Sequence, residues 1–213
     1  MLFSRHITAD ARLSRRHTLA GLAIAGAALL GCDPRGVGGA PSFAGIDITG
    51  ASYGKGFSLL DAHGQRRTLD DFRGKVVMLY FGFVQCPDVC PTALARASAV
   101  MQALGPQANE VQLIFVTVDP ERDTPELLRE YMAAFDSRFV ALTGSLSDIE
   151  QTAREFKAYF SKVPTGSSYT MDHTALTYLF DRQGRIRVAL RHEQTTQDYL
   201  ADTRSLLAEK ASG

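Results

Sequence analysis

Two uninterrupted apolar runs constrain the fold of this chain most strongly. Residues 75–81 (KVVMLYF) and 111–118 (VQLIFVTV) show almost no polar alternation, which is typical of parallel strands buried on both faces. Between them, residues 91–104 carry apolar side chains at helical spacing, and Pro91 suits the first helical position. A strand, a helix and a second strand in this order predict a β-α-β unit at the centre of an α/β domain.

Further elements are expected on both sides of this unit. A hairpin is predicted over residues 57–60 and 65–69, and a second over 174–180 and 186–190, each with a polar turn. We expect a short strand over 139–142. One helix should begin at Asp123 or Thr124, and two further helices should cover 147–160 and 196–210. The predicted fold class is therefore α/β, with a mixed central sheet flanked by helices and an N-terminal β-hairpin extension.

The N-terminal residues 1–32 have the pattern of an export signal. Basic residues precede the apolar stretch 19–30. Its twelve residues would span about 18 Å as a helix, too short for a bilayer core of about 30 Å. Residues 14–19 (SRRHTL) resemble a twin-arginine signal in which Thr18 replaces the usual Phe, and a Sec-type signal is the alternative.

The segment 29–32 (LLGC) resembles a bacterial lipobox, in which Cys32 would be lipidated and become the new N-terminus. A chance cysteine beside the signal is the alternative. The acyl chains would anchor the protein to a membrane, and Asp33 resembles the signal that retains lipoproteins at the inner membrane. We expect residues 33–52, rich in Gly, Pro, Ser and Ala, to form a flexible tether, and 53–213 to form the folded domain.

Charge and cysteine content exclude some classes of protein. Lys and Arg number 23, as do Asp and Glu, and no basic cluster of the kind that binds nucleic acid stands out. Three cysteines are too few for a disulfide-stapled scaffold, so each needs its own explanation.

Two of these cysteines lie where α/β sheets bind ligands. Cys86 and Cys90 follow the apolar run 75–81 and precede the predicted helix. Residues i and i+4 of a helical turn have Cβ atoms about 5–6 Å apart, so the sulfurs can bind one soft metal ion or, after a small adjustment, close a disulfide. The helix N-terminus favours thiolates, which serve both as metal ligands and as nucleophiles. Two unrelated buried cysteines are the alternative.

A third metal ligand has to come from elsewhere in the chain. His173 directly precedes the strand predicted over 174–180, and the loop that enters this strand in a thioredoxin-like sheet passes the cysteine pair. The other histidines lie in the export signal, in a polar turn or beyond the last predicted strand: His6, His17, His63 and His192. From the residues alone, a structural role for His173 stays open.

The motifs around these residues resemble those of the Sco/SenC family of copper-binding assembly proteins. The resemblance covers roughly residues 53–210 and is carried by DFRGKVV (71–77), YFGF (80–83), CPDVCP (86–91), VDPERDTP (118–125), LTG (142–144) and DHT (172–174). DFRGKVV recurs in many thioredoxin-like proteins and is a weak signal. The cysteine motif together with VDPERDTP and DHT is specific.

The resemblance implies a thioredoxin-like fold and one copper ion, as Cu(I), Cu(II) or both, held by Cys86, Cys90 and His173. Two thiolates and an imidazole leave a coordination position open, which disfavours a closed structural zinc site, and soft thiolates suit Cu(I).

Three carboxylates are candidates to tune or orient these ligands. Asp119 ends the second buried strand at the same sheet edge, although capping of the following loop is the alternative. Asp88, between the cysteines, and Asp172, beside His173, are candidates for orientation or for contact with a partner.

By resemblance, we expect an exported copper chaperone, lipid-anchored at the periplasmic face of the bacterial inner membrane. It would deliver copper to the copper A centre of cytochrome c oxidase, with the copper-bearing subunit of that oxidase, or another copper-handling protein, as its partner. The alternative is a periplasmic thiol–disulfide reductase that keeps a partner's copper-ligand cysteines reduced, with Cys86 and Cys90 as its redox-active pair. A thioredoxin-fold peroxidase is disfavoured because such enzymes rely on one activated thiol in a different motif. We expect a metallochaperone rather than an enzyme.

Overall fold

Two fully buried strands form the centre of the structure, a computed structural model in which residues 42–209 are described. β4 (Val76–Gly82) and β5 (Val111–Thr117) are buried at every position. They pair in parallel and are connected through α1 (Val89–Leu104). The predicted β-α-β unit is therefore confirmed, although the helix begins two residues before Pro91.

These strands belong to an eight-stranded mixed sheet with the order β1-β10-β9-β4-β5-β6-β2-β3. β4, β5 and β6 run parallel, and the remaining pairs are antiparallel. The other strands of this sheet are β1 (Ile46–Asp47), β2 (Ser58–Asp61), β3 (Arg66–Thr68), β6 (Val140–Thr143), β9 (Leu176–Phe180) and β10 (Ile186–Arg191). Both predicted hairpins are present, as β2–β3 and β9–β10, and the α/β fold with its mixed sheet is confirmed.

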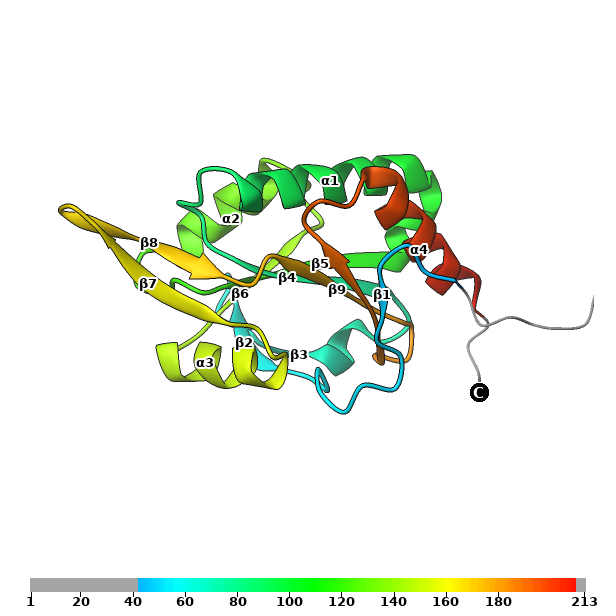
Figure 1. Cartoon of the computed structure of the whole chain (residues 1–213), viewed down its shortest axis with the longest axis horizontal. Coiled ribbons are helices and arrows are strands. Elements are labelled where there is room, and N and C mark those ends of the chain that lie inside the picture. The colour runs from blue at the N-terminus through cyan, green and yellow to red at the C-terminus, as the bar shows by residue number, and fades with distance from the viewer. Residues whose placement is uncertain (1–41, 210–213) are drawn as a thin grey trace, which may run out of the picture. The chain divides into compact units, whose positions relative to one another are not determined.

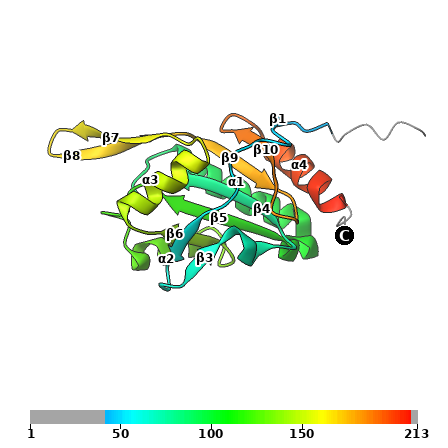
Figure 2. The same cartoon turned by 90° about the horizontal axis from the view of Figure 1, so that it is seen from below.

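Helices cover both faces of the sheet (Figures 1 and 2). α1 packs against α4 (Thr196–Ala208) on one face, and α3 (Leu146–Glu155) lies on the other. α2 (Pro125–Ala133) begins after Thr124, whose hydroxyl accepts the Leu127 N–H, as the sequence indicates. None of the helices in residues 42–209 has the length and apolar character needed to cross a bilayer.

The helix predicted over 147–160 is shorter than expected. α3 ends at Glu155 because Lys157 adopts a left-handed backbone with φ of 52°. The Lys157 N–H donates to the Arg154 carbonyl and the Ala158 N–H to the Ala153 carbonyl, which is the Schellman pattern of a helix C-terminus. Glycine usually occupies this left-handed position, so a lysine there conceals the helix end in the sequence.

The residues after α3 form a hairpin that sequence analysis did not predict. β7 (Phe160–Thr165) and β8 (Ser168–His173) make a two-stranded sheet that is not hydrogen-bonded to the main sheet. Figure 1 shows it extending beyond the helices at the left. Most of β7 is exposed, and Pro164 lies within it. The apolar alternation by which strands are recognised is therefore weak here.

The domain also begins earlier than predicted. Residues 42–52 were expected to belong to a flexible tether, but β1 lies in this segment and pairs with β10. The backbone N–H groups of Ala44 and Gly45 donate to the buried Asp202 carboxylate at 2.7 and 2.8 Å. A Cβ at Gly45 would lie 2.5 Å from Val188 Cγ1, so glycine allows this close approach. The predicted export signal and Cys32 lie outside the described residues.

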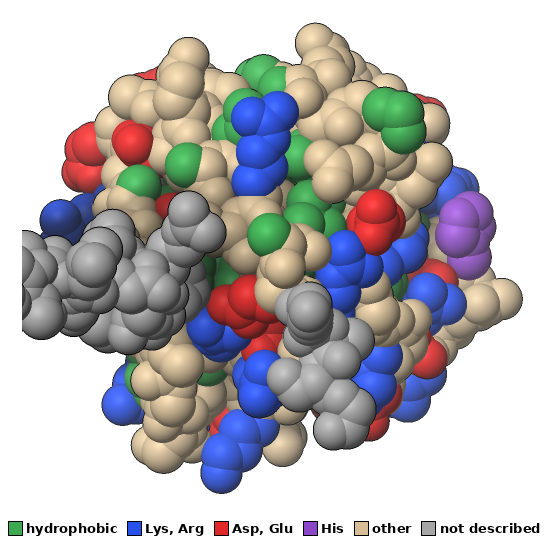
Figure 3. Space-filling model, turned by 90° about the vertical axis from the view of Figure 1, so that its right-hand side faces the viewer, with side chains coloured by type: hydrophobic (Ala, Val, Ile, Leu, Met, Phe, Trp, Pro, Cys, Tyr) green, Lys and Arg blue, Asp and Glu red, His purple; other side chains and the backbone are tan. Residues whose placement is uncertain are grey.

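The end of the molecule that carries β1 and the C-terminus of α4 has interspersed basic and acidic side chains (Figure 3). Ion pairs here include Arg187 with Glu209 and Arg185 with Asp181.

Candidate metal centre

The end of β4 and the start of α1 place the two cysteines. Cys86 lies in the loop between these elements, and Cys90 is the second residue of α1. Both thiols are free and buried, with exposed fractions of 8% and 0%. The Cys90 backbone N–H donates to Cys86 Sγ at 3.4 Å, so the first turn of the helix brings the two residues together.

Gly82 makes room for the Cys90 sulfur. A Cβ at this position would lie 2.9 Å from Cys90 Sγ and 2.7 Å from Phe115 Cε2. Both neighbours are fully buried and have no free space to move into. The glycine of the FGF segment therefore shapes the site, a role that its sequence position does not reveal.

Replacing Gly82 with alanine is expected to lower the free energy of unfolding by about 1–3 kcal/mol, because overpacking strains a dense core. It should also displace the Cys90 sulfur and weaken metal binding. Denaturant unfolding measures the first effect and a metal titration the second. Gly56→Ala is the matched control, since a Cβ at Gly56 meets nothing within 4 Å. Equal losses in both variants would contradict this role of Gly82.

His173 reaches the cysteines from the last position of β8. Its Nε2 lies 3.5 Å from Cys90 Sγ, and ligand atoms of Cys86, Cys90 and His173 all lie within 4.8 Å of one another. The structure thus brings together the three residues that the sequence singled out. It corrects the position of His173, which was expected in a loop and instead ends a strand of the β7–β8 hairpin.

The environment of the imidazole favours one tautomer. His173 Nδ1 lies 3.2 Å from the Thr174 carbonyl oxygen. A carbonyl can only accept, so Nδ1 is the ring nitrogen that donates, and Nε2 is the nitrogen that faces the sulfurs and is placed to ligate a metal ion. The rings of Tyr80 and Phe83 meet the imidazole edge-on, at centroid distances of 6.0 and 5.8 Å. These contacts hold the ring in an orientation suited to metal ligation.

The two thiols differ in acidity. The hydrogen bond from Cys90 lowers the pKa of Cys86 to about 4, although burial acts in the opposite direction. The hydrogen bond to Cys86 and burial both raise the pKa of Cys90. Burial also raises the pKa of Tyr80, whose neutral hydroxyl points at Cys90 Sγ from 3.9 Å. The reduced, metal-free site therefore holds one thiolate and one thiol.

We expect Cys86 to react with iodoacetamide at a rate that stays level from about pH 8 to pH 5, since the thiolate is the nucleophile. The rate should fall as the pH approaches about 4, where Cys86 takes up its proton. Mass spectrometry of the reduced, metal-free protein at each pH measures this profile. A small free thiol, with an ordinary pKa near 8.5, is the control. A rate for Cys86 that rises tenfold per unit between about pH 6 and 8, as for that thiol, would contradict the assignment.

The three carboxylates singled out in the sequence lie near the site without joining the cluster. Asp119 is buried and accepts the Tyr169 hydroxyl at 2.8 Å and the Arg122 Nε–H. Asp88 and Asp172 are exposed. The Thr174 carbonyl, rather than Asp172, is the hydrogen-bond partner of the imidazole Nδ1.

Sequence reasoning missed the role of Asp123. Its buried carboxylate accepts the Thr117 hydroxyl at 2.6 Å and the Val84 N–H at 3.1 Å, and so ties the cysteine loop to the end of β5. Burial raises the pKa of Asp123 to about 6. The VDPERDTP motif could have indicated this role, because it contains Asp123. From the sequence alone, Asp123 is interpreted only as a possible first residue of a helix.

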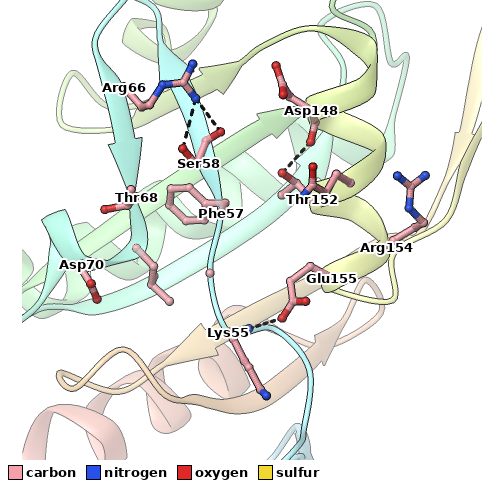
Figure 4. A pocket seen from close by; sticks show the side chains of 13 residues that line it. Lys55, Phe57, Ser58, Arg66, Thr68, Asp70, Asp148, Thr152, Arg154 and Glu155 are labelled. Atoms are coloured by element: carbon pink, nitrogen blue, oxygen red, sulfur yellow. Dashed lines mark hydrogen bonds between the residues drawn. The ribbon is translucent and has the colours of Figure 1, made fainter.

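A cavity of about 780 Å³ lies away from this cluster, between α3 and the β2–β3 hairpin (Figure 4). Basic and acidic side chains line it together, among them Arg66, Arg154, Asp148 and Glu155. Neither cysteine nor His173 contributes to it.

The donor set of the cluster favours a soft or borderline metal. Among residues 42–209, no fourth His, Cys, Asp or Glu joins Cys86, Cys90 and His173. Structural zinc sites normally use four protein ligands. Two sulfurs suit Cu(I), and the imidazole makes Cu(II) compatible as well.

Known proteins resemble this chain over most of the described domain. Protein sco1 of Schizosaccharomyces pombe is 38% identical over 150 residues, which cover 68% of this chain and 57% of that protein. The chain thus matches less than two thirds of that relative's length. ScoI of Bradyrhizobium japonicum, solved with copper bound, is 40% identical with a TM-score of 0.67, over 73% of this chain and 99% of that one.

A third similar protein is BsSco, described as a member of the Sco family of cytochrome c oxidase assembly proteins with a disulfide switch. It is 27% identical with a TM-score of 0.63, over 78% of this chain and 99% of that one. These structures confirm the thioredoxin-like fold. The family model described as SCO1/SenC matches residues 47–208. By fold, by cysteine motif and by this match, the chain belongs to the SCO1/SenC family.

Proposed function

We propose that this protein binds one copper ion through Cys86, Cys90 and His173 and delivers it to the copper A centre of cytochrome c oxidase during assembly. The observation that carries the proposal is the convergence of two sulfurs and one imidazole, from segments 83 residues apart, within 4.8 Å. The copper-bound structure of the similar ScoI supports the choice of metal.

The arrangement suits a carrier. Cys86 supplies a preformed thiolate, and a thiol proton is released from Cys90 when both sulfurs ligate, so loading depends on pH and on the reduced state of the pair. The three protein donors leave a coordination position that a recipient's ligand can occupy. A copper ion held at such a site can pass to a recipient protein by ligand exchange.

Thiol–disulfide reduction is the second candidate, and the unequal acidity of the two thiols favours it. The Cys86 thiolate would attack a partner's disulfide, and Cys90 would lose its proton and displace the partner's thiolate. The partner disulfide gains two electrons, while the Cys86–Cys90 pair loses two and forms a disulfide. This role requires no ligation by His173.

Transfer to a metal-free copper A domain distinguishes the two functions. The copper-loaded protein is mixed with a reduced domain, and the metal-free reduced protein with an oxidised one. A carrier fills the reduced domain with copper, and His173→Ala prevents the filling. If only the oxidised domain reacts, and His173→Ala reacts equally well, the protein is a reductase.

We also propose that the domain is exported and held at the periplasmic face of the inner membrane by lipid on Cys32. The lipobox-like segment 29–32 supports this proposal. Mass spectrometry of the N-terminus from membranes should find acylated Cys32 as the first residue. A mature chain that begins elsewhere and carries no lipid would refute the anchor.

A further inference from the structure

One guanidinium lies between the segments that assemble the candidate metal centre. Arg122, in the loop after β5, donates from Nη1 to Gln85 Oε1 at 3.1 Å, next to Cys86 in the chain. The same nitrogen donates to the Tyr169 carbonyl of β8 at 2.8 Å. Arg122 Nε pairs with the Asp119 carboxylate. A single side chain thus contacts the cysteine loop, the β5 loop and the hairpin that carries His173.

Tyr169 makes this contact an anchor for the hairpin. The Arg122 guanidinium carbon lies 3.7 Å from the centroid of the Tyr169 ring, and the Tyr169 hydroxyl donates to Asp119 at 2.8 Å. Side chains alternate along a strand, so Tyr169, Met171 and His173 lie on one face of β8. Met171 is buried and the other two are half-buried, which shows that this face packs on the domain.

The hairpin depends on such anchors for its position. An isolated two-stranded hairpin is marginally stable in water, and β7–β8 shares no backbone hydrogen bonds with the main sheet. The Arg122–Asp119 pair is largely shielded, with side-chain exposures of 17% and 1%, which strengthens its charge-assisted hydrogen bonds. A second link, from Lys162 to Glu121 at 2.6 Å, is exposed and contributes less.

We propose that Arg122 is a positioning residue that, through Tyr169, holds the β7–β8 hairpin so that His173 closes the metal site against Cys86 and Cys90. This inference rests on the proposed copper binding. Without the guanidinium, the hairpin loses the hydrogen bond at the Tyr169 carbonyl and its link to the cysteine loop. Of the anchors at Tyr169, only the hydroxyl bond to Asp119 remains, so the imidazole spends less time beside the sulfurs. A dithiol site remains, so loss of Arg122 should mimic loss of His173.

A double-mutant cycle tests the inference in the full-length chain, purified in detergent with Cys32→Ser in every variant. Cu(I) affinity is measured by competition with a chromophoric chelator for the parent, Arg122→Ala, His173→Ala and the double variant. Arg122→Ala should weaken Cu(I) binding at least tenfold when His173 is present and less than twofold when His173 is already replaced. The effects of two substitutions are not additive when one residue acts through the other. Arg129→Ala, whose guanidinium binds the Ala62 carbonyl instead, is the matched control and should bind as the parent does.

A second readout needs no metal. Backbone amides of residues 160–173 should exchange with solvent at least tenfold faster in metal-free Arg122→Ala than in the parent, while β4 and β5 stay protected. Tyr169→Ala removes the ring that packs on Arg122 and the hydroxyl that binds Asp119. It should reproduce both the loss of Cu(I) affinity and the faster exchange, and it takes the place of Arg122→Ala if the arginine variant does not fold.

The outcomes separate the inference from the proposed function. Unchanged affinity and exchange in Arg122→Ala, or equal affinity losses with and without His173, would overturn the positioning role alone. Equal affinities for the parent and His173→Ala would overturn ligation by His173 and, with it, the positioning role.

Discussion

Replacing His173 with alanine is expected to lower the Cu(I) affinity of the reduced protein by ~100-fold, because one of three donors is lost. This size is estimated from structural zinc sites, in which four ligands share a binding free energy of ~10–16 kcal/mol, or about 3 kcal/mol per ligand. Since about 1.4 kcal/mol corresponds to a tenfold change in affinity, the loss of one ligand amounts to ~100-fold. The Cys86–Cys90 pair remains, so disulfide exchange with a small thiol should stay within about twofold of the parent rate.

His63→Ala is the matched control, because His63 is exposed in the turn between β2 and β3. It should leave both copper affinity and thiol exchange unchanged. If His173→Ala and His63→Ala bind copper equally well, the imidazole is not a ligand. The reductase then becomes the better explanation of the cysteine pair.

Replacing Cys90 with alanine should have a larger effect, more than ~100-fold on Cu(I) affinity, since a thiolate is a better Cu(I) ligand than an imidazole. Alanine also removes the hydrogen bond that lowers the pKa of Cys86, so that pKa should rise from about 4 toward its usual value. Competition titration and the pH profile of Cys86 alkylation measure the two effects. Retained copper affinity together with an unshifted Cys86 profile would contradict the shared role of the pair.

The centre of the fold could be predicted because its signals are local. β4 and β5 are continuous apolar runs, and the helix between them, α1, carries its own periodicity. The spacing of Cys86 and Cys90 at a strand–helix junction is equally local, so the pair could be recognised from the sequence. His173 is 83 residues from Cys90, and its selection depended on the family resemblance as well as on its place before a strand.

The features that were missed depend on contacts between distant segments. The β7–β8 hairpin has few apolar residues of its own, and it packs on the domain through one face of β8. Asp123 binds the Val84 backbone, 39 residues earlier in the chain, and Arg122 binds Gln85 and Tyr169. Nothing in the neighbouring sequence of these residues indicates such partners. The early end of α3 was missed for a different reason, the unusual left-handed Lys157.

X-ray absorption spectroscopy of the reduced protein loaded with one equivalent of Cu(I) tests the three-residue site most directly. The expected spectrum contains two sulfur donors and one imidazole nitrogen, and the imidazole contribution disappears in His173→Ala. A first shell without nitrogen in the parent protein, or an identical spectrum in the variant, would show that copper does not bind where Cys86, Cys90 and His173 converge.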